Sequence, residues 1–384
     1  MAYDDFLPFS RPTISEETIQ EVAECLRSGW ITTGPRVQKF ETALKDYLGA
    51  PHALMVMSAT SGLHLTLMAL GIGPGDEVIT PSLTFVATLN VIANLGAKPV
   101  LVDIDPSTLN IEVNHLRDLI TPRTRAIMPV HYAGLPVNCD EIYAIAKEYN
   151  LRVIEDAAHA IGSQYNGKKI GSFGDIQVFS FHPNKNMTTI EGGCVVTRDD
   201  EFAKKFNLYR FHGIDRESWN RFGKNGSQHY DVVLPGLKSN MSDVQAAVGI
   251  HQLAALDGFN ARRQELAQRY HEALQGIPAL TLPVNPAEHP GHAWHLYCAC
   301  INPQYTTYTR DTFMDALKER GIGTGLHYTA THLFTYYQNE FGYRLGDFPA
   351  TESVCARIMS LPLFPTLTNE QQDRVIATIK ELLG

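Results

Sequence analysis

Polar residues directly follow two apolar runs of the chain. Asp156 comes after the run Leu151–Glu155, and Ser180 and Lys185 lie at and just beyond the end of the run Ile176–Phe181. Apolar runs of this length are typical of buried strands. Because ligands of open α/β sheets bind beyond the carboxyl ends of the strands, a carboxylate, a hydroxyl and an amine could meet there.

A hydroxyl pair and an aromatic residue could complete that site. Thr60 and Ser61 stand between a predicted strand and a predicted helix, where hydroxyls and free backbone N–H groups can converge on a phosphate. Phe85 begins another predicted helix and could offer an apolar face to a ring. A lysine that forms a Schiff base with an aldehyde, and an aspartate that keeps a ring nitrogen protonated, are what a protein supplies to pyridoxal phosphate. Lys185 and Asp156 are the candidates for these two roles.

Each candidate also has a structural interpretation when it is taken alone. These are a solvated loop for Lys185, a core position for Phe85, structural roles for His159 and His182, and helix caps for Asp156, Thr60 and Ser61. The order of the candidates on successive strand ends favours the functional interpretation.

The elements that must position these residues alternate between strand and helix from Ala53 to about Thr197. The predicted strands are Ala53–Met57, Val78–Thr80, Pro99–Ile104, Arg125–Val130, Leu151–Glu155, Ile176–Phe181 and Cys194–Thr197. The predicted helices between them are Thr60–Leu70, Phe85–Leu95, Glu112–Ile120 and Cys139–Tyr149. Continuous apolar strands separated by helices indicate an α/β fold with a mainly parallel sheet covered on both faces.

The rest of the chain predicts a smaller unit. A long helix capped by Ser242 runs to about Leu274, and the Pro/Gly-rich segment Ile277–Gly291 follows as a linker. Beyond it we expect a strand over Ala293–Ile301, a helix capped by Thr309, and a final helix with a capping box at Thr368 and Gln371. We therefore predict a large α/β domain over residues 1–275, with an N-terminal arm and the long linking helix, and a small C-terminal α+β domain over residues 276–384.

Composition excludes several classes of protein. The 384 residues carry 32 Lys and Arg against 41 Asp and Glu, a net charge of −9, which argues against general binding to nucleic acid or anionic lipid. No run approaches the length of a membrane span, and the acidic start of the chain is unlike a signal peptide. The six cysteines are scattered without a CxxC pair. We expect a cytoplasmic protein.

Two further kinds of site are poorly supported. The runs Gly71–Gly75 and Gly321–Gly325 both lack the third glycine of the nicotinamide fingerprint G-x-G-x-x-G. His289, His292 and His295 could suggest a metal, but on an extended segment they would not share a face, and we expect no metal site.

The run from Phe179 to Gly193, which holds Ser180 and Lys185, resembles the lysine motif of the DegT-type sugar aminotransferases. These are fold-type-I pyridoxal phosphate enzymes. The resemblance covers nearly the whole chain. Its other matching runs are Ser28–Pro35, Ser58–Gly62, Gly73–Phe85, Glu155–His159, Asn240–Ala247, Gly321–Tyr328 and Ser360–Pro365.

The resemblance implies a role for each matching residue. Lys185 matches the Schiff-base lysine, Asp156 the partner of the pyridine nitrogen, and His159 a contact of the ring hydroxyl. It further implies phosphate ligands at Thr60, Ser61 and Ser180, a stacking ring at Phe85, a phosphate contact from the neighbouring subunit of a homodimer at Asn240, and substrate contacts at His327 and His332.

The reaction implied is transfer of an amino group from L-glutamate to a keto-sugar in lipopolysaccharide biosynthesis. The Lys185 amine would move the proton, which requires it to be partly neutral near pH 7, and Asp156 would stay ionised beside the pyridinium. Within the family the chain is most similar to the enzymes that make UDP-4-amino-4-deoxy-L-arabinose. A UDP-linked 4-keto pentose, or a related nucleotide-linked 4-keto sugar, is then the expected acceptor.

Alternatives stay open at this point. The motif around Lys185 reads His182-Pro183-Asn184 and ends Thr189-Ile190-Glu191, flanking positions at which the chain departs from the lipid A branch, so the sugar is open. One alternative is a transaminase that makes 8-amino-3,8-dideoxy-manno-octulosonate. Another is a regulator that binds pyridoxal phosphate without catalysis. A dehydratase on the same fold is disfavoured because such relatives carry His in place of the lysine.

Overall fold

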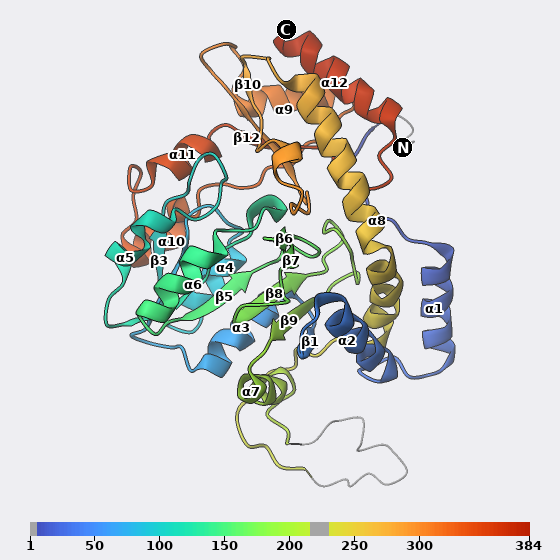
Figure 1. Ribbon diagram of the computed structural model, residues 1–384, viewed down its shortest axis with the longest axis vertical. Helices are drawn as coiled ribbons and strands as arrows, with labels where there is room; N and C mark the ends of the chain where they lie inside the picture. The colour runs from blue at the N-terminus through green and yellow to red at the C-terminus, as the bar shows by residue number, and fades with distance from the viewer. Residues whose placement is uncertain (1–5, 216–229) are drawn as a thin grey trace.

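A seven-stranded sheet forms the centre of the larger part of the molecule in the computed structural model, which describes residues 6–215 and 230–384 (Figure 1). The strands lie in the order β1-β9-β8-β5-β4-β2-β3. Their bounds are β1 His52–Val56, β2 Glu77–Pro81, β3 Lys98–Val102, β4 Thr124–Ile127, β5 Arg152–Asp156, β8 Ile176–Ser180 and β9 Gly193–Thr197. Only β9 runs antiparallel to its neighbours in this sheet, so the predicted mainly parallel sheet is confirmed.

Helices cover both faces of the sheet, as continuous apolar strands require. One face packs against α2, α6 and α8, whose apolar side chains share a buried core with Met55, Val153 and Phe179. The other packs against α3, α4 and α7, around Val78 and Ile154. The helices of this part are α1 Glu16–Arg27, α2 Pro35–Leu48, α3 Ala59–Leu70, α4 Ala87–Ala93, α5 Leu116–Leu119, α6 Cys139–Glu148, α7 Asp200–Arg210 and α8 Asp243–Leu274.

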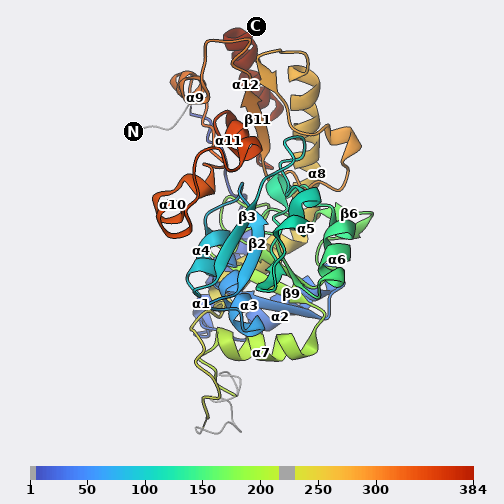
Figure 2. The ribbon, with the colours of Figure 1, turned by 90° about the vertical axis from the view of Figure 1, so that its left-hand side faces the viewer.

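The C-terminal part has its own sheet and core. Its antiparallel sheet has the order β10-β11-β12, and α9 and α12 lie against it (Figure 2). Its core also includes Leu266, Tyr270 and Leu274 of α8, so the 32-residue α8 runs from one core into the other. The bounds are β10 Leu280–Thr281, β11 Tyr297–Ile301, α9 Arg310–Glu319, α10 Thr335–Phe341, α11 Pro349–Cys355, β12 Ile358–Leu361 and α12 Asn369–Leu383, with a small hairpin of β6 Gln164–Tyr165 and β7 Lys168–Lys169 in the larger part.

Several predicted boundaries are confirmed by their caps and others are wrong. Ser242 and Gln245, and Thr368 and Gln371, form the capping boxes of α8 and α12. The helix expected over residues 112–120 is instead a 3₁₀ turn followed by the single turn of α5.

The strand expected over Ala293–Ile301 starts later in the structure, at Tyr297. Trp294 has a positive φ of 47°, and the N–H groups of Ala293 and Leu296 bond to carbonyls of the 3₁₀ turn Tyr132–Gly134, so pairing in the small sheet begins only at Tyr297. Within the described ranges, no helix is both long and apolar enough to cross a membrane.

Candidate active site

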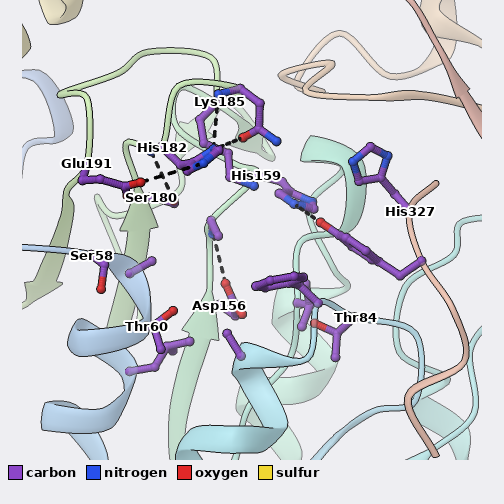
Figure 3. Close-up of a pocket in the computed structure, with 18 of the residues that line it drawn as sticks. Ser58, Thr60, Thr84, Asp156, His159, Ser180, His182, Lys185, Glu191 and His327 are labelled. Atoms are coloured by element: carbon purple, nitrogen blue, oxygen red, sulfur yellow. Dashed lines mark hydrogen bonds and ion pairs between the residues drawn. The ribbon is translucent and has the colours of Figure 1, made fainter. Parts of the chain in front are cut away.

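A cavity of about 430 Å³ opens where β5 and β8 end and α3 begins (Figure 3). Because β5 and β8 pair in parallel, their carboxyl ends lie at the same edge of the sheet. The lining residues include the predicted site residues Thr60, Phe85, Asp156, His159, Ser180, Lys185 and His327. Side chains from five separate parts of the sequence therefore meet in one cavity.

Asp156 is the last residue of β5 and is buried at the floor of the cavity. Its Oδ2 accepts a hydrogen bond of 2.8 Å from the Thr88 hydroxyl, and its Oδ1 accepts one of 3.1 Å from the Ala158 N–H. Burial raises the pKa of this carboxyl above its ordinary value, although both hydrogen bonds and the nearby Lys185 oppose the shift. Within the described part of the chain it forms no ion pair, and a cation placed directly against it would favour its ionised form.

Lys185 lies on the loop after β8, where its N–H bonds to the His182 carbonyl. Its Nζ lies 3.5 Å from Nε2 of His295. Desolvation lowers the pKa of this amine from 10.5 to about 8, while the carboxylate of Asp156 acts in the opposite direction. A substantial fraction of the amine is therefore neutral near physiological pH, as the expected proton transfer requires.

His159 is held in one tautomer by its surroundings. The Ala133 N–H donates to Nδ1 at 3.2 Å, which leaves the proton of a neutral ring on Nε2, and Nε2 lies 3.0 Å from the Tyr328 hydroxyl. Burial places the pKa of His159 well below its ordinary value. The ring is thus a neutral donor to the hydroxyl oxygen of Tyr328, whose own proton is free for another acceptor.

Hydroxyl groups surround the start of α3. Ser58 caps the helix by accepting from the Ser61 N–H at 3.1 Å, and Thr60 and Ser180 line the cavity beside it. The Ser61 hydroxyl is 3.1 Å from that of Ser58 and does not itself line the cavity. A Cβ on Gly62 would lie 2.9 Å from Val178, so glycine allows α3 to approach the sheet this closely. The result is an anion site made of a helix start and hydroxyls.

Phe85 is an aromatic ring that projects into the cavity instead of the core. It is 55% exposed, and its centroid lies 5.7 Å from that of Tyr328. A buried carboxylate, a lysine amine, an anion site and a half-exposed ring thus share one cavity. These groups match the ring nitrogen, aldehyde, phosphate and ring face of pyridoxal phosphate, so the residues fit this cofactor.

His327 and His332, both expected to contact substrate, lie in different surroundings. His327 lines the cavity with Nδ1 2.8 Å from the Ser360 hydroxyl, and burial lowers its pKa to about 4. His332 does not line the cavity: its Nε2 is 2.9 Å from Glu352. The 3₁₀ turn that carries His332 is bonded to the Ser82 carbonyl through Thr331, which holds the imidazole outside the cavity. The prediction of a substrate contact at His332 is not supported by this position.

Asn240 also lies away from the cavity of its own chain. It pairs with Val56, its Nδ2 donates to the Thr33 hydroxyl, and its Oδ1 accepts from Lys238 at 2.6 Å. This agrees with the expectation that Asn240 would serve a neighbouring subunit, and does not test it.

Three residues of the site were missed as site residues by sequence reasoning. Thr88 bonds to Asp156 from α4, Tyr328 bonds to His159, and His295 contacts Lys185. His295 was considered only as a metal ligand together with His289 and His292. The described residues hold no group of three or more His, Cys, Asp or Glu that could bind a metal ion.

Comparison with known proteins relates the chain to aminotransferases. The sequence model of the DegT/DnrJ/EryC1/StrS aminotransferase family matches residues 12–380. The spore coat polysaccharide biosynthesis protein SpsC of Bacillus subtilis is 46% identical over 381 residues, which are 98% of this chain and 97% of that protein.

Two solved structures are similar over nearly the whole chain. The putative sugar aminotransferase Spr1654 of Streptococcus pneumoniae, in its PMP-form, has a TM-score of 0.90 and 33% identity, and covers 98% of each chain. The aminotransferase PseC of Helicobacter pylori, involved in pseudoaminic acid biosynthesis, has a TM-score of 0.90 and 32% identity, and covers 99% of each chain. None of these three names specifies the UDP-linked pentose expected from the sequence.

Proposed function

Because the chain belongs to the DegT/DnrJ/EryC1/StrS aminotransferase family, whose members use pyridoxal phosphate, we propose that it transfers an amino group from L-glutamate to a nucleotide-linked 4-keto sugar. The observation that carries the proposal is the placement of Lys185 and Asp156 on the ends of two parallel strands around one cavity. The product would serve a cell-surface polysaccharide such as lipopolysaccharide. SpsC and PseC, which are named for spore coat polysaccharide and pseudoaminic acid biosynthesis, support this class of product.

The residues divide the cofactor between them. Asp156 would hold the ring nitrogen, Lys185 the aldehyde and His159 the ring hydroxyl, while Phe85 would cover one face of the ring. The hydroxyls of Thr60 and Ser180 and the start of α3 would hold the phosphate, and Ser61 would join them only if its hydroxyl turned from Ser58 toward the cavity. When bound, pyridoxal phosphate supplies an electron sink and carries the amino group between donor and acceptor.

Lys185 would carry the proton that moves between two carbon atoms when the amino group is transferred. Its pKa of about 8 leaves enough neutral amine to take a proton from the α-carbon of the donor, and the resulting ammonium would deliver that proton to the cofactor carbon that receives the amino group. A cationic ring nitrogen against Asp156 would offset the desolvation cost of the ionised carboxylate, because an opposite charge favours that form.

The mouth of the cavity provides the groups for the sugar. Ser360 fixes Nδ1 of His327, which leaves Nε2 for a hydroxyl or carbonyl of the substrate. His182, Asn184 and Glu191 form a polar rim, in which His182 contacts both of the others, at 2.9 Å to Asn184 and 4.0 Å to Glu191. Polar groups that must each find a partner discriminate well between sugars with different hydroxyl patterns.

A homodimer with shared sites is part of the proposal. Four large apolar side chains (Ile31, Met57, Ile190 and Leu237) are exposed around the segment 238–245, which contains Asn240. Hydrogen bonds tie their neighbours to this segment, from Met57 N–H to the Ser239 carbonyl and from Gln245 to the Glu191 carbonyl. Exposed apolar side chains gathered in this way are typical of a protein interface, and a partner there would meet Asn240.

Mixed dimers test the shared site. Lys185→Ala and Asn240→Asp should each be nearly inactive, the second because a carboxylate would repel the phosphate. In a mixed dimer, one of the two sites would combine an intact Lys185 with an intact Asn240, so mixing the variants should restore activity. No recovery in mixtures that contain mixed dimers would contradict the shared site.

The function itself is tested by running the second half of the reaction. The protein is loaded with pyridoxamine phosphate and offered keto-sugars, and return of the aldehyde form is followed by its absorbance. We expect return with a nucleotide-linked 4-keto sugar, with the UDP-linked 4-keto pentose as one arm, and none in Lys185→Ala. Return only with the keto precursor of 8-amino-3,8-dideoxy-manno-octulosonate would favour that alternative, and no return with any keto-sugar would contradict the proposal.

A further inference from the structure

His295 is a buried imidazole that contacts the Lys185 amine and is not among the residues assigned to the cofactor or the sugar. Its Nε2 lies 3.5 Å from Nζ of Lys185. The ring packs on that of His159, with centroids 4.4 Å apart. Its other nitrogen, Nδ1, is buried without a hydrogen-bond partner. Among the described residues, the lysine amine is the one polar group that the ring nitrogens contact.

The backbone that carries His295 is fixed by costly interactions. Nη1 of Arg263, on α8, lies within 3.2 Å of the carbonyl oxygens of Trp294 and His295 and 2.9 Å from that of Leu363. Arg263 is buried, and within the described residues it has no carboxylate partner. Burial lowers its pKa to about 10. Moving the carbonyls of Trp294 and His295 away would deprive this buried guanidinium of two partners, which is costly, so the backbone at His295 is held in place.

The same segment is tied to the loop of the lysine. Nδ2 of Asn186, the residue after Lys185, donates to the Ala293 carbonyl and to Oδ1 of Asn260, both at 2.7 Å. Lys185 and His295 are thus held on two segments that are joined beside them. Movement of one relative to the other would break these bonds.

We propose that His295 is a positioning residue for Lys185, which keeps the amine directed into the cavity in both of its protonation states. Toward an ammonium, Nε2 accepts a hydrogen bond. Toward a neutral amine, a ring protonated on Nε2 donates to the nitrogen. In either tautomer Nδ1 is buried without a hydrogen bond among the described residues, which is unfavourable. This is consistent with a ring placed for its contact at Nε2. The inference rests on the proposed role of Lys185.

Four charged or titratable groups surround this pair. Asp156 ends β5, His159 follows β5, His327 follows α9, Arg263 lies on α8, and His295 itself precedes β11. Burial lowers the pKa of each of the three histidines, so all three rings are neutral near pH 7. Asp156 and Arg263 are the other ionisable groups named around the pair, and both are kept in every His295 variant.

The test measures the titration of the Lys185 amine in the full-length chain freed of its cofactor. A small amine-reactive reagent is applied across a range of pH, and labelling of the peptide that contains Lys185 is read by mass spectrometry, with the exposed Lys147 as internal reference. His295→Leu removes the acceptor, and His295→Gln keeps a polar group near the position of Nε2. His292→Leu is the matched control, because His292 is a buried histidine of the same segment that stacks on Trp294, at 3.8 Å between centroids.

We expect His295→Leu to reduce the proton affinity of the amine about tenfold, the loss of one hydrogen bond to a charged group, and so to lower its midpoint by about one pH unit. His295→Gln and His292→Leu should stay within about twofold of the wild type. An unchanged or raised midpoint in His295→Leu, or an equal fall in either of the other two variants, would overturn the proposal.

If His295→Leu does not fold, His295→Met takes its place with the same expectation. The labelling does not depend on transamination. A failure of the keto-sugar screen would therefore leave this test intact, and a failure here would leave the screen intact.

Discussion

Replacing Asp156 with Asn should weaken the cofactor site while stabilising the cofactor-free protein. The substitution keeps the shape of the side chain and removes its charge. The hydroxyl of Thr88, which donates to Oδ2, can rotate to accept from the new amide and donate to Thr84, 2.8 Å away. Both hydrogen-bond partners of the carboxylate, Thr88 and Ala158, then keep a partner, so the effects report mainly the charge.

The loss in cofactor binding follows from the charged hydrogen bond that disappears. Such a bond contributes about 1.5–3 kcal/mol, so the affinity for pyridoxal phosphate should fall roughly tenfold to 150-fold. Turnover should fall further, by about 10²–10³, because the carboxylate stabilises charge that develops during the reaction.

The gain in stability depends on pH with a definite sign. Burial raises the pKa of Asp156, so the folded chain binds this proton more tightly than the unfolded chain. The contribution of the carboxyl group is then full below the unfolded pKa of about 4 and is lost as the pH rises through the folded pKa, at about 1.4 kcal/mol per pH unit. Asparagine avoids this loss, so the advantage of the variant should grow from about pH 4 upward and then level off.

Urea unfolding of the cofactor-free proteins across this pH range, together with titration by pyridoxal phosphate, measures both effects. Asp243→Asn is the matched control. Its buried carboxylate accepts from the N–H groups of Gly34, Arg36 and Val37, so an amide nitrogen there should destabilise the fold by about 1–3 kcal/mol. A cofactor-free Asp156→Asn that is less stable than the wild type at neutral pH, or that binds the cofactor equally well, would refute this reasoning.

Further predictions concern three other residues. The kcat of the wild type should rise with pH through a midpoint at or below about 8, as Lys185 loses its proton, and a pH-rate profile without this limb would contradict the assignment. Phe85→Ala should weaken cofactor binding about tenfold with little change in the melting temperature of the cofactor-free protein, because the ring is 55% exposed. His332→Ala should lower the free energy of unfolding by about 1–3 kcal/mol through its lost bond to Glu352. The KM for the sugar should change less than twofold, and a large rise would restore the predicted substrate contact.

The larger part of the fold was predictable because its signals are local. The apolar runs that became β5 and β8 are continuous, and the residue that follows or ends each run marks a strand end without any knowledge of distant segments. The same holds for the capping boxes at Ser242 and Thr368, whose partners lie three residues away. This locality is why Asp156 and Lys185 could be placed at one edge of the sheet.

The missing site residues depend on packing between distant segments. Tyr328 meets His159 across 169 positions and His295 meets Lys185 across 110, and no spacing in the sequence marks either pair. The early start expected for β11 has the same origin, since residues before Tyr297 bond to the turn Tyr132–Gly134 and not to the small sheet. His332 shows the converse: it lies beyond the matching run Gly321–Tyr328, and the resemblance alone did not reveal that its turn is anchored to Ser82 outside the cavity.

The decisive test of whether Lys185 binds the cofactor aldehyde is borohydride reduction of the protein loaded with pyridoxal phosphate, because reduction makes the bond between cofactor and lysine permanent. Peptide mass spectrometry then locates the modified residue. We expect the phosphopyridoxyl group on Lys185 alone in the wild type, and no such group in the Lys185→Ala variant. Attachment at another lysine, or no attachment while the cofactor is bound, would contradict it.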